Sequence, residues 1–210
     1  MTLWLRPLFR CESFNLNFHS RLNIFSAVGT DTTATTIRTT MLYVMTNPRV
    51  YRNIQAEIDS TIREGLVISD KQARTLPYLQ AIIKEGSRIC PPATGILSKK
   101  APPEGESFKG RFIPGGVEIG QCAWGLQRSK DVYGDDSELF RPERWLEAKG
   151  KKLEKMEKSL GLIWGYGKFS CLGKHIAFLE LNKIFFEVSW IAKLKQPAML
   201  LIANYISISF

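Results

Sequence analysis

The chain has 210 residues, which is enough for one domain with a hydrophobic core or for a portion of a larger one. Hydrophobic residues make up 44% of the chain and charged residues 23%, the proportions of an ordinary soluble globular protein. The formal net charge of +9 suits a nucleic acid, an acidic membrane lipid or an acidic protein as partner. Because the sequence has neither a basic-aromatic stripe nor a nucleic-acid motif, we expect a solvated basic surface and no nucleic-acid partner.

Cysteine and histidine usage narrows the kinds of site to expect. The cysteines are Cys11, Cys90, Cys122 and Cys171, and the histidines are His19 and His175. No Cys-x-x-Cys pair occurs, so a structural zinc site is not expected. Two histidines also argue against a Ser-His-Asp hydrolase. A Cys171–His175 nucleophile stays open, although no Asn or Asp that would orient it is recognisable.

Residues 1–22 show no clear hydrophobic period, and we expect an irregular leader there. From Asn23 to Asn47 the apolar spacing predicts a helix. Five of the residues from 30 to 36 are threonine, which is a poor helix former. A conflict between local propensity and the predicted element often marks a functional segment.

This threonine-rich segment allows two interpretations. In the structural one, Thr30 or Asp31 caps the first turn of a helix. In the functional one, Gly29 leaves a notch in the helix, Thr32 offers a hydroxyl into it and Asp31 delivers a proton. Apolar residues begin well before Gly29, which favours a helix that starts upstream and therefore the functional interpretation.

Three further helices are predicted. Asn47-Pro48 ends the first helix and starts a second, which Gly65 would stop. A shorter helix is expected after Ser69-Asp70. The next helix follows Leu76-Pro77-Tyr78, and its inward residues are predicted to be Leu79, Ile82, Ile83 and Ile89. Glu85 and Arg88 lie three apart on one face of that helix, where they form an ordinary pair unless other charges join them.

The segment from 91 to 123 is rich in proline and glycine and carries short β-like runs at Thr94–Ser98, Arg111–Ile113 and Val117–Cys122. Pro114-Gly115-Gly116 would turn one run into the next. We therefore expect a mainly α fold with a small antiparallel β-sheet (α+β). The charged segment from Lys149 to Lys158 is expected to be a solvated surface excursion.

A glycine-rich loop runs from Trp164 to Lys174. Gly165 and Gly167 can adopt positive φ angles, so the chain can turn sharply and pass close to a flat ligand. Cys171 is predicted at the start of a helix, where backbone N–H groups stabilise a thiolate. The apolar residues of that helix are Ile176, Phe178, Leu179, Ile184, Phe185 and Val188. Such a thiolate, wrapped in Trp, Phe and Leu, is a good axial ligand for haem iron.

Two other interpretations of this loop are weaker. A lone cysteine is usually a small buried hydrophobe. A phosphate-binding loop needs the pattern Gly-x-x-x-x-Gly-Lys-Ser/Thr, which no register of this segment supplies.

The loop resembles the cysteine-ligand loop of the cytochrome P-450 monooxygenases, Phe-Gly-x-Gly-x-Arg-x-Cys-x-Gly. The glycines and the cysteine in register are Gly165, Gly167, Cys171 and Gly173. Two positions depart from the pattern. Trp164 replaces the Phe, and Phe169 stands where a basic residue usually meets a haem propionate. Lys168 lies beside that position and is the candidate substitute.

Three other motifs resemble the same family and occur in its order. Residues 29–33 resemble the distal oxygen-activation helix, Ala/Gly-Gly-x-Asp/Glu-Thr-Thr, with Val28 at the small position. Glu85 and Arg88 match a Glu-x-x-Arg pair, and residues 140–145 match its Pro-Glu-Arg-Phe/Trp partner. This resemblance implies that Glu85, Arg88 and Arg144 form a buried charge network that holds the approach to the haem loop.

The resemblance covers about residues 23–190 and implies the C-terminal part of the family's fold, with 191–210 as a divergent apolar tail. It implies haem b as cofactor, with its iron ligated by Cys171. The other haem-binding residues implied are Trp164, Gly165, Gly167, Lys168 and Gly173. Asp31 and Thr32 would be catalytic residues that handle oxygen and protons.

The resemblance also implies an activity: insertion of one oxygen atom from O2 into a lipophilic small molecule, with electrons from an NAD(P)H-dependent reductase. The proline-rich and glycine-rich segments between 91 and 128 are similar to fungal members that act in secondary metabolism. The family implies association with the endoplasmic reticulum membrane, although no anchor is evident; otherwise we expect a cytoplasmic protein. The alternative is a truncated, inactive fragment that cannot close a haem pocket, because full-length members are much longer.

Overall fold

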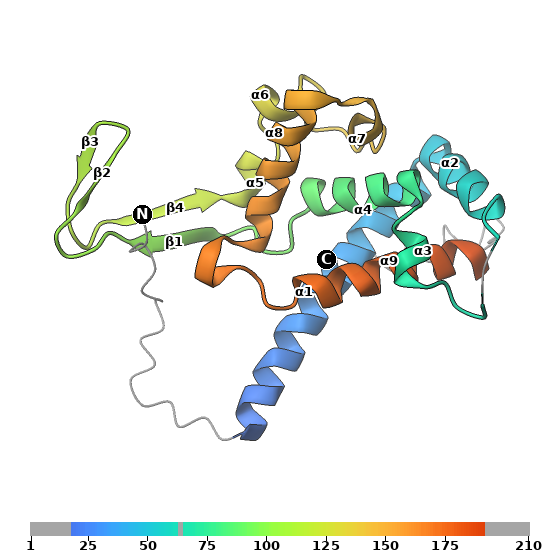
Figure 1. Ribbon diagram of the computed structural model, residues 1–210, viewed down its shortest axis with the longest axis horizontal. Coiled ribbons are helices and arrows are strands. Elements are labelled where there is room, and N and C mark those ends of the chain that lie inside the picture. Colours follow the sequence, from blue (N-terminus) through green and yellow to red (C-terminus); the bar gives the residue numbers. More distant parts are fainter. Residues whose placement is uncertain (1–17, 63–64, 192–210) are drawn as a thin grey trace.

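The computed structural model describes residues 18–62 and 65–191 (Figure 1). Most of the predicted leader and nearly all of the predicted apolar tail lie outside these residues. The described chain is mainly helical and has short antiparallel strand pairs, so the predicted fold class is confirmed. The helices are α1 (Phe18–Thr46), α2 (Pro48–Asp59), α3 (Asp70–Ala73), α4 (Pro77–Ile89), α5 (Ala123–Leu126), α6 (Lys130–Tyr133), α7 (Arg144–Glu147), α8 (Gly150–Gly161) and α9 (Lys174–Ile191).

The main hydrophobic core lies where α1, α2, α4 and α9 pack together (Figure 1). Its fully buried residues come from helical spacings of three and four on each helix, as expected for one apolar face. They include Val50, Ile54 and Ile58 of α2, Leu79, Ile82 and Ile83 of α4, and Leu181, Phe185 and Phe186 of α9. The N-terminal half of α1 projects away from these packed helices, whereas its C-terminal half joins the core.

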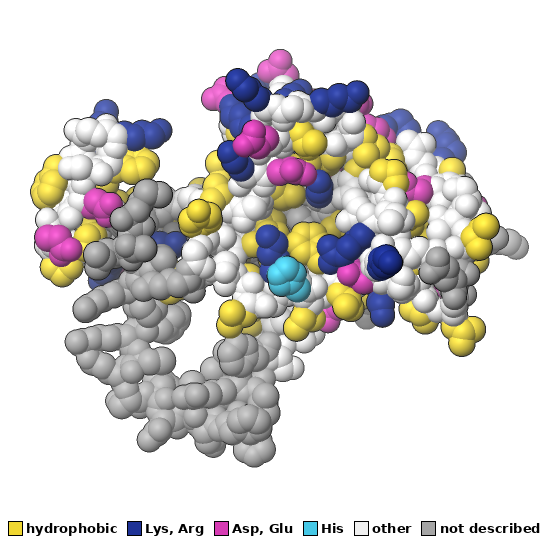
Figure 2. All heavy atoms as spheres, viewed as in Figure 1, with side chains coloured by type: hydrophobic (Ala, Val, Ile, Leu, Met, Phe, Trp, Pro, Cys, Tyr) yellow, Lys and Arg dark blue, Asp and Glu magenta, His cyan; other side chains and the backbone are white. Residues whose placement is uncertain are grey.

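A second core covers the opposite face of α4. Ala81 of α4 packs there with Tyr133 and Trp145, and α8 adds Met156 and Leu160. Because both faces are covered, α4 is buried almost all round, and its polar residues Glu85 and Arg88 are buried with it. Lys, Arg, Asp and Glu side chains gather on the outer surface of this α6–α8 lobe, with both signs interspersed (Figure 2).

The strands form two separate antiparallel pairs. β1 (Ile96–Lys100) pairs with β4 (Glu118–Cys122), and β2 (Glu106–Phe108) pairs with β3 (Arg111–Ile113). The β2–β3 hairpin turns at Lys109 and Gly110, whose φ angles of 49° and 77° are those of a two-residue type I′ turn. Antiparallel pairing was predicted correctly. Strand β2 was missed, and the Pro114-Gly115-Gly116 turn connects β3 to β4 without pairing them.

Two local predictions were wrong. Gly65 does not end helix α2, which ends at Asp59. The Ser60 amide donates to carbonyls of the last turn, and Ile62 beyond the helix is 88% exposed. The charged segment 149–158 is not a surface excursion, because it forms most of α8 and buries Met156. Lysines and glutamates on the outer face of that helix obscured the apolar spacing of Leu153, Met156 and Leu160.

The start of α4 is capped by another helix. Leu76, at the cap position, has no side-chain acceptor to offer. Glu57 of α2 supplies both acceptors: the Tyr78 amide donates to Oε1 and the Leu79 amide donates to Oε2, each at 2.8 Å. A carboxylate at a helix N-terminus is also favoured by the helix dipole. Glu57 therefore fixes where α4 begins relative to α2.

Among the helices in the described ranges, none combines the length and the apolar character needed to cross a bilayer.

We expect Glu57→Ala to lower the free energy of unfolding by about 1–3 kcal/mol, because two partly buried N–H groups lose a charged acceptor. Urea denaturation followed by circular dichroism measures this loss. Glu154→Ala is the matched control, since Glu154 pairs with Lys158 on the exposed surface of α8. Equal unfolding midpoints for the two variants would contradict the capping role.

Candidate functional site

The cysteine loop is closed by its own backbone. The short helix η1 (Leu162–Trp164) ends at Gly165, and a second turn, η2 (Gly167–Phe169), follows. The φ angles of Gly165 and Gly167 are 73° and 61°, in the region that the sequence predicted for them. The Cys171 amide then donates to the Trp164 carbonyl at 2.7 Å, which ties the two ends of the turn together.

Only glycine fits at position 165. A Cβ atom built there would lie 2.4 Å from the Phe169 carbonyl oxygen, closer than real Cβ contacts allow. The loop therefore folds tightly on itself, with Gly165 close to the backbone of Phe169 and Ser170.

Cys171 lies just before α9 and not inside its first turn. The helix begins at Lys174, whose amide donates to the Cys171 carbonyl at 3.3 Å. The thiol is exposed. The Trp164 ring packs against Phe178 of α9 with 5.2 Å between centroids, so the aromatic residue in the Phe position of the motif anchors the loop to the helix.

Large apolar side chains are exposed on the loop and on the elements beside it. They are Leu172 in the loop at 87%, Ile176 and Leu179 of α9 at 65% and 41%, Ile96 of β1 at 71% and Val28 of α1 at 60%. Exposed apolar surface of this kind marks a place where a ligand or another chain packs. A tight glycine turn, an exposed thiol and exposed apolar side chains together fit a flat apolar macrocycle with a thiolate-ligated metal.

A cation lies near the position where the motif departs from its usual pattern. The Nζ atom of Lys99, on β1, is 5.5 Å from the centroid of the Phe169 ring. Lys168 is the residue that the sequence predicts for this charge. Its backbone lies in η2, and its side chain is outside the described part of the structure. No sequence spacing pointed to Lys99, because the contact depends on how β1 packs beside the loop.

Asp31 and Thr32 lie near the middle of α1. Because α1 begins at Phe18, neither Thr30 nor Asp31 caps this helix, and the N-cap interpretation is wrong. Asp31 is exposed, and the Thr32 hydroxyl donates to the Val28 carbonyl at 2.9 Å. Within the described residues, hydrogen bonds and ion pairs do not join either side chain to the cysteine loop, so their catalytic role stays a prediction.

Glu85, Arg88 and Arg144 do come together, and all three are buried. Glu85 Oε1 accepts from Arg88 Nη2 at 2.8 Å and from Arg144 Nε at 3.0 Å, and Oε2 accepts from Arg88 Nε at 2.9 Å. Trp145 Nε1 donates to Oε2 and the Arg141 amide donates to Oε1, both at 2.8 Å. Five donors from two segments, α4 and residues 141–145, thus meet one carboxylate, which compensates for its removal from water.

The remaining N–H groups of the two arginines bind backbone carbonyls between α5 and α7. Arg88 Nη1 donates to Gln127 at 2.6 Å and to Ser137 at 2.7 Å. Arg144 donates to Tyr133 from Nη1 and to Leu139 from Nη2, at 2.8 Å and 3.1 Å. The segment from 127 to 139 is therefore held in place by guanidinium groups from elements on both sides of it in sequence.

Asp136 is a second carboxylate of this network, and no motif indicated it. It accepts from Arg141 Nε at 2.5 Å and from Arg144 Nη1 at 2.9 Å. Burial on its own would raise the pKa of Asp136, but the hydrogen bonds and charges of these two arginines hold the pKa below its usual value. Burial raises the pKa of Tyr133, whose ring lies 4.9 Å from the Arg88 guanidinium, to about 12. Asp136 is thus ionised and Tyr133 neutral at physiological pH.

A chain of contacts leads from this network to the cysteine loop. Gln127, whose carbonyl binds Arg88, donates from its side chain to the Ser159 carbonyl of α8 at 2.7 Å. The Tyr133 hydroxyl donates to Gln127 Oε1 at 2.6 Å. Helix α8 continues into η1, which ends at Trp164, the acceptor for the Cys171 amide.

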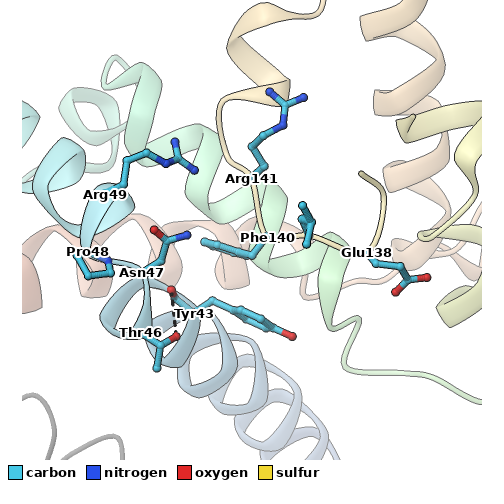
Figure 3. Close-up of a pocket in the computed structure, with 9 residues that line it drawn as sticks. Tyr43, Thr46, Asn47, Pro48, Arg49, Glu138, Phe140 and Arg141 are labelled. Carbon is cyan, nitrogen blue, oxygen red and sulfur yellow. Dashed lines mark hydrogen bonds between the residues drawn. The ribbon is translucent and has the colours of Figure 1, made fainter. Parts of the chain in front are cut away.

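A pocket of about 430 Å³ lies elsewhere, between the end of α1, the start of α2 and residues 138–141 (Figure 3). The Tyr43 and Phe140 rings stack along one side of it, 4.9 Å apart. Its two arginines are already paired, Arg49 with Glu143 and Arg141 with Asp136. No residue of the cysteine loop lines this pocket, so it is not the candidate site.

Comparison with known proteins agrees with the motifs. The family model described as Cytochrome P-450 matches residues 19–188. Cytochrome P-450 monooxygenase ABA1 of Pyricularia oryzae is 49% identical over 164 residues, which are 76% of this chain and 32% of that protein. Cytochrome P-450 monooxygenase aba1 of Botryotinia fuckeliana is 45% identical over 163 residues, with the same shares. Pisatin demethylase of Fusarium vanettenii is 39% identical over 162 residues, or 77% of this chain and 30% of that protein.

The matched region contains all four motifs, from the threonine-rich segment of α1 to the cysteine loop. The chain spans about a third of the length of these relatives.

We expect Glu85→Gln to cost about 3–5 kcal/mol of folding free energy, because two buried guanidinium groups lose their shared counter-ion. Urea denaturation measures the loss. The control is Lys100→Gln at the exposed Lys100–Glu118 pair, 3.7 Å apart, where less than about 1 kcal/mol is expected. If Glu85→Gln is no more costly than this control, the network does not hold the fold.

Proposed function

Because the chain belongs to the cytochrome P-450 family, we propose that it provides the cysteine-ligand site of a haem-thiolate monooxygenase. The observation that supports this most directly is the exposed residue Cys171, whose amide closes a turn in which Gly165 and Gly167 both have positive φ angles. Such a turn brings the backbone close beneath a flat ligand while the thiol reaches its metal.

Membership in the family implies a thiolate-ligated haem as cofactor. In the proposed site Cys171 ligates the iron, Trp164 and the glycines Gly165, Gly167 and Gly173 form the cradle, and Lys168 flanks it. The haem supplies activation of O2, and the electron push of a thiolate ligand favours cleavage of the O–O bond. Lys99 is a second candidate, beside Lys168, for the positive charge that a haem propionate requires.

The protein groups proposed to manage protons are Asp31 and Thr32. Asp31 is exposed, so its carboxylate can exchange a proton with water. Thr32 lies one residue further along α1, and its hydroxyl, which donates to the Val28 carbonyl, is proposed to donate a hydrogen bond to the oxygen ligand or to a water beside it. Gly29 adds no side chain there, and a Cβ at that position would meet nothing within 4 Å.

We further propose that the oxygen acceptor is a lipophilic small molecule and that an NAD(P)H-dependent reductase supplies electrons. The exposed apolar side chain of Val28, on the same helix as Asp31 and Thr32, supports an apolar substrate region beside these two residues. The relatives are fungal monooxygenases, and pisatin demethylase is named for a demethylation, which supports oxidative chemistry of fungal secondary metabolism. The endoplasmic reticulum membrane is the proposed location, by analogy with the family.

We expect the 210-residue chain, after reconstitution with haem and reduction, to give a thiolate-type Soret band with carbon monoxide. Cys171→Ser should abolish that band without changing the helical circular dichroism, because only the ligand is lost. Cys122→Ser is the matched control, since Cys122 is also exposed but lies at the end of β4.

A thiolate-type band that survives in Cys171→Ser would contradict the ligand assignment. If the parent chain itself is folded but gives no such band, haem binding by this chain fails, and the inactive-fragment alternative would be favoured.

A further inference from the structure

Helices α1 and α4 touch at a point where there is no room for one more carbon atom. Gly86 of α4 stands between Glu85 and Arg88 of the buried network. A Cβ atom built on Gly86 would lie 1.9 Å from Oγ1, 2.6 Å from Cγ2 and 2.7 Å from Cβ of Thr40 in α1. All three contacts are shorter than real Cβ atoms show, so the close approach of the helices requires glycine at this position.

Rotation of the Thr40 side chain cannot relieve this overlap. The Cβ atom of Thr40 does not move when χ1 changes, and it is itself within 2.7 Å of the added atom. Thr40 is fully buried, so its side chain also has no open space to enter. Any side chain at position 86 must therefore push the backbones of α1 and α4 apart, because packed interiors do not absorb extra volume.

Thr40 differs from other threonines of α1 in what its hydroxyl does. The hydroxyls of Thr32, Thr36, Thr39 and Thr46 each donate to the carbonyl four residues earlier in the helix. The Thr40 hydroxyl has no hydrogen-bond partner among the described residues and lies against α4 instead. A buried hydroxyl without a partner is costly, so contact with Gly86, and not hydrogen bonding, fixes this side chain.

We propose that Gly86 is a positioning residue whose contact with Thr40 sets the spacing between α1 and α4. Helix α1 carries Asp31 and Thr32, and α4 carries Glu85 and Arg88. The contact between Gly86 and Thr40 therefore sets the position of the proposed proton-transfer residues relative to the buried charge network. The effect of this spacing on proton transfer by Asp31 and Thr32 rests on the proposed function. Its geometric claim, that a side chain at 86 moves the projecting half of α1, does not depend on haem.

The size of the movement follows from the overlap. An ordinary contact of about 3.4 Å in place of 1.9 Å requires the helices to separate by about 1.5 Å or more at the crossing. Thr32 lies eight residues before Thr40, about 12 Å along the helix axis, so a tilt of α1 about the crossing carries over to it. Interactions within α4 remain intact, because Glu85 and Arg88 are unchanged.

The test measures position directly in the full 210-residue chain. Nitroxide labels are placed at Ser26→Cys on the projecting half of α1 and at Lys152→Cys on α8, both exposed positions, with the native cysteines replaced by serine. Pulsed electron paramagnetic resonance gives the distance between them. Gly86→Ala should shift this distance by about 1.5 Å or more. Gly161→Ala, the control, should leave it unchanged, since a Cβ at Gly161 of α8 meets nothing within 4 Å.

Second substitutions at Thr40 distinguish a specific effect on helix spacing from a general loss of core packing. Thr40→Ala leaves its Cβ atom within 2.7 Å of the added atom, so Gly86→Ala/Thr40→Ala should recover only part of the parent distance. Gly86→Ala/Thr40→Gly should recover most of it, together with the urea midpoint. If Gly86→Ala alone does not fold, folding of the Thr40→Gly double variant supports the proposal.

The proposal is overturned if Gly86→Ala keeps the parent label-to-label distance. It is also overturned if the double variant Gly86→Ala/Thr40→Gly recovers neither the parent distance nor the parent stability to urea. Neither result bears on haem binding, which the carbon monoxide spectrum tests separately.

Discussion

The described structure depends on one buried carboxylate. Glu85 has no exposed surface, and an ionised carboxylate in that position is tolerable only if donors surround it. Its donors are Arg88 of α4, Arg141 just before α7, and Arg144 and Trp145 in the first turn of α7. Satisfying this single charge forces two regions that are more than fifty residues apart in sequence into fixed contact, and the guanidinium groups then bind the carbonyls of residues between them.

The same constraint reaches the candidate site through hydrogen bonds from side chains to backbone carbonyls. Arg88 fixes the Gln127 carbonyl, the Gln127 side chain binds the end of α8, and α8 leads into the turn whose Trp164 carbonyl accepts from Cys171. A thiol must be held to within a fraction of an ångström to serve a metal, and a loop alone seldom does so. We propose that the network supports the cysteine loop, at the cost of burying several charges.

Much of this arrangement was readable from the sequence, because the family motifs mark residues whose side chains interact. Glu85, Arg88, Arg144 and the positive φ angles of Gly165 and Gly167 were predicted, and the family resemblance is confirmed. What was missed acts through the backbone or through tertiary packing. Gln127 and Ser137 contribute backbone carbonyls, which every residue has, so their role cannot be predicted from residue type. Asp136 and Lys99 reach their partners only after the segments around them have packed. Helix α8 was missed for a local reason, since its charges outnumber its three inward apolar residues.

Amide hydrogen exchange at Cys171 in Gln127→Leu tests most directly whether the network supports the loop. This substitution leaves Glu85 and every residue of the loop in place and removes the side-chain hydrogen bonds of Gln127 to the Ser159 carbonyl and the Tyr133 hydroxyl. The account predicts that the Cys171 amide, which donates to Trp164 at 2.7 Å in the parent, exchanges faster in the variant, while the amides of Ile54 and Ile58 in α2 keep their protection. Unchanged exchange at Cys171, or equal acceleration at all three positions, would mean that the loop holds its shape independently of the buried charges.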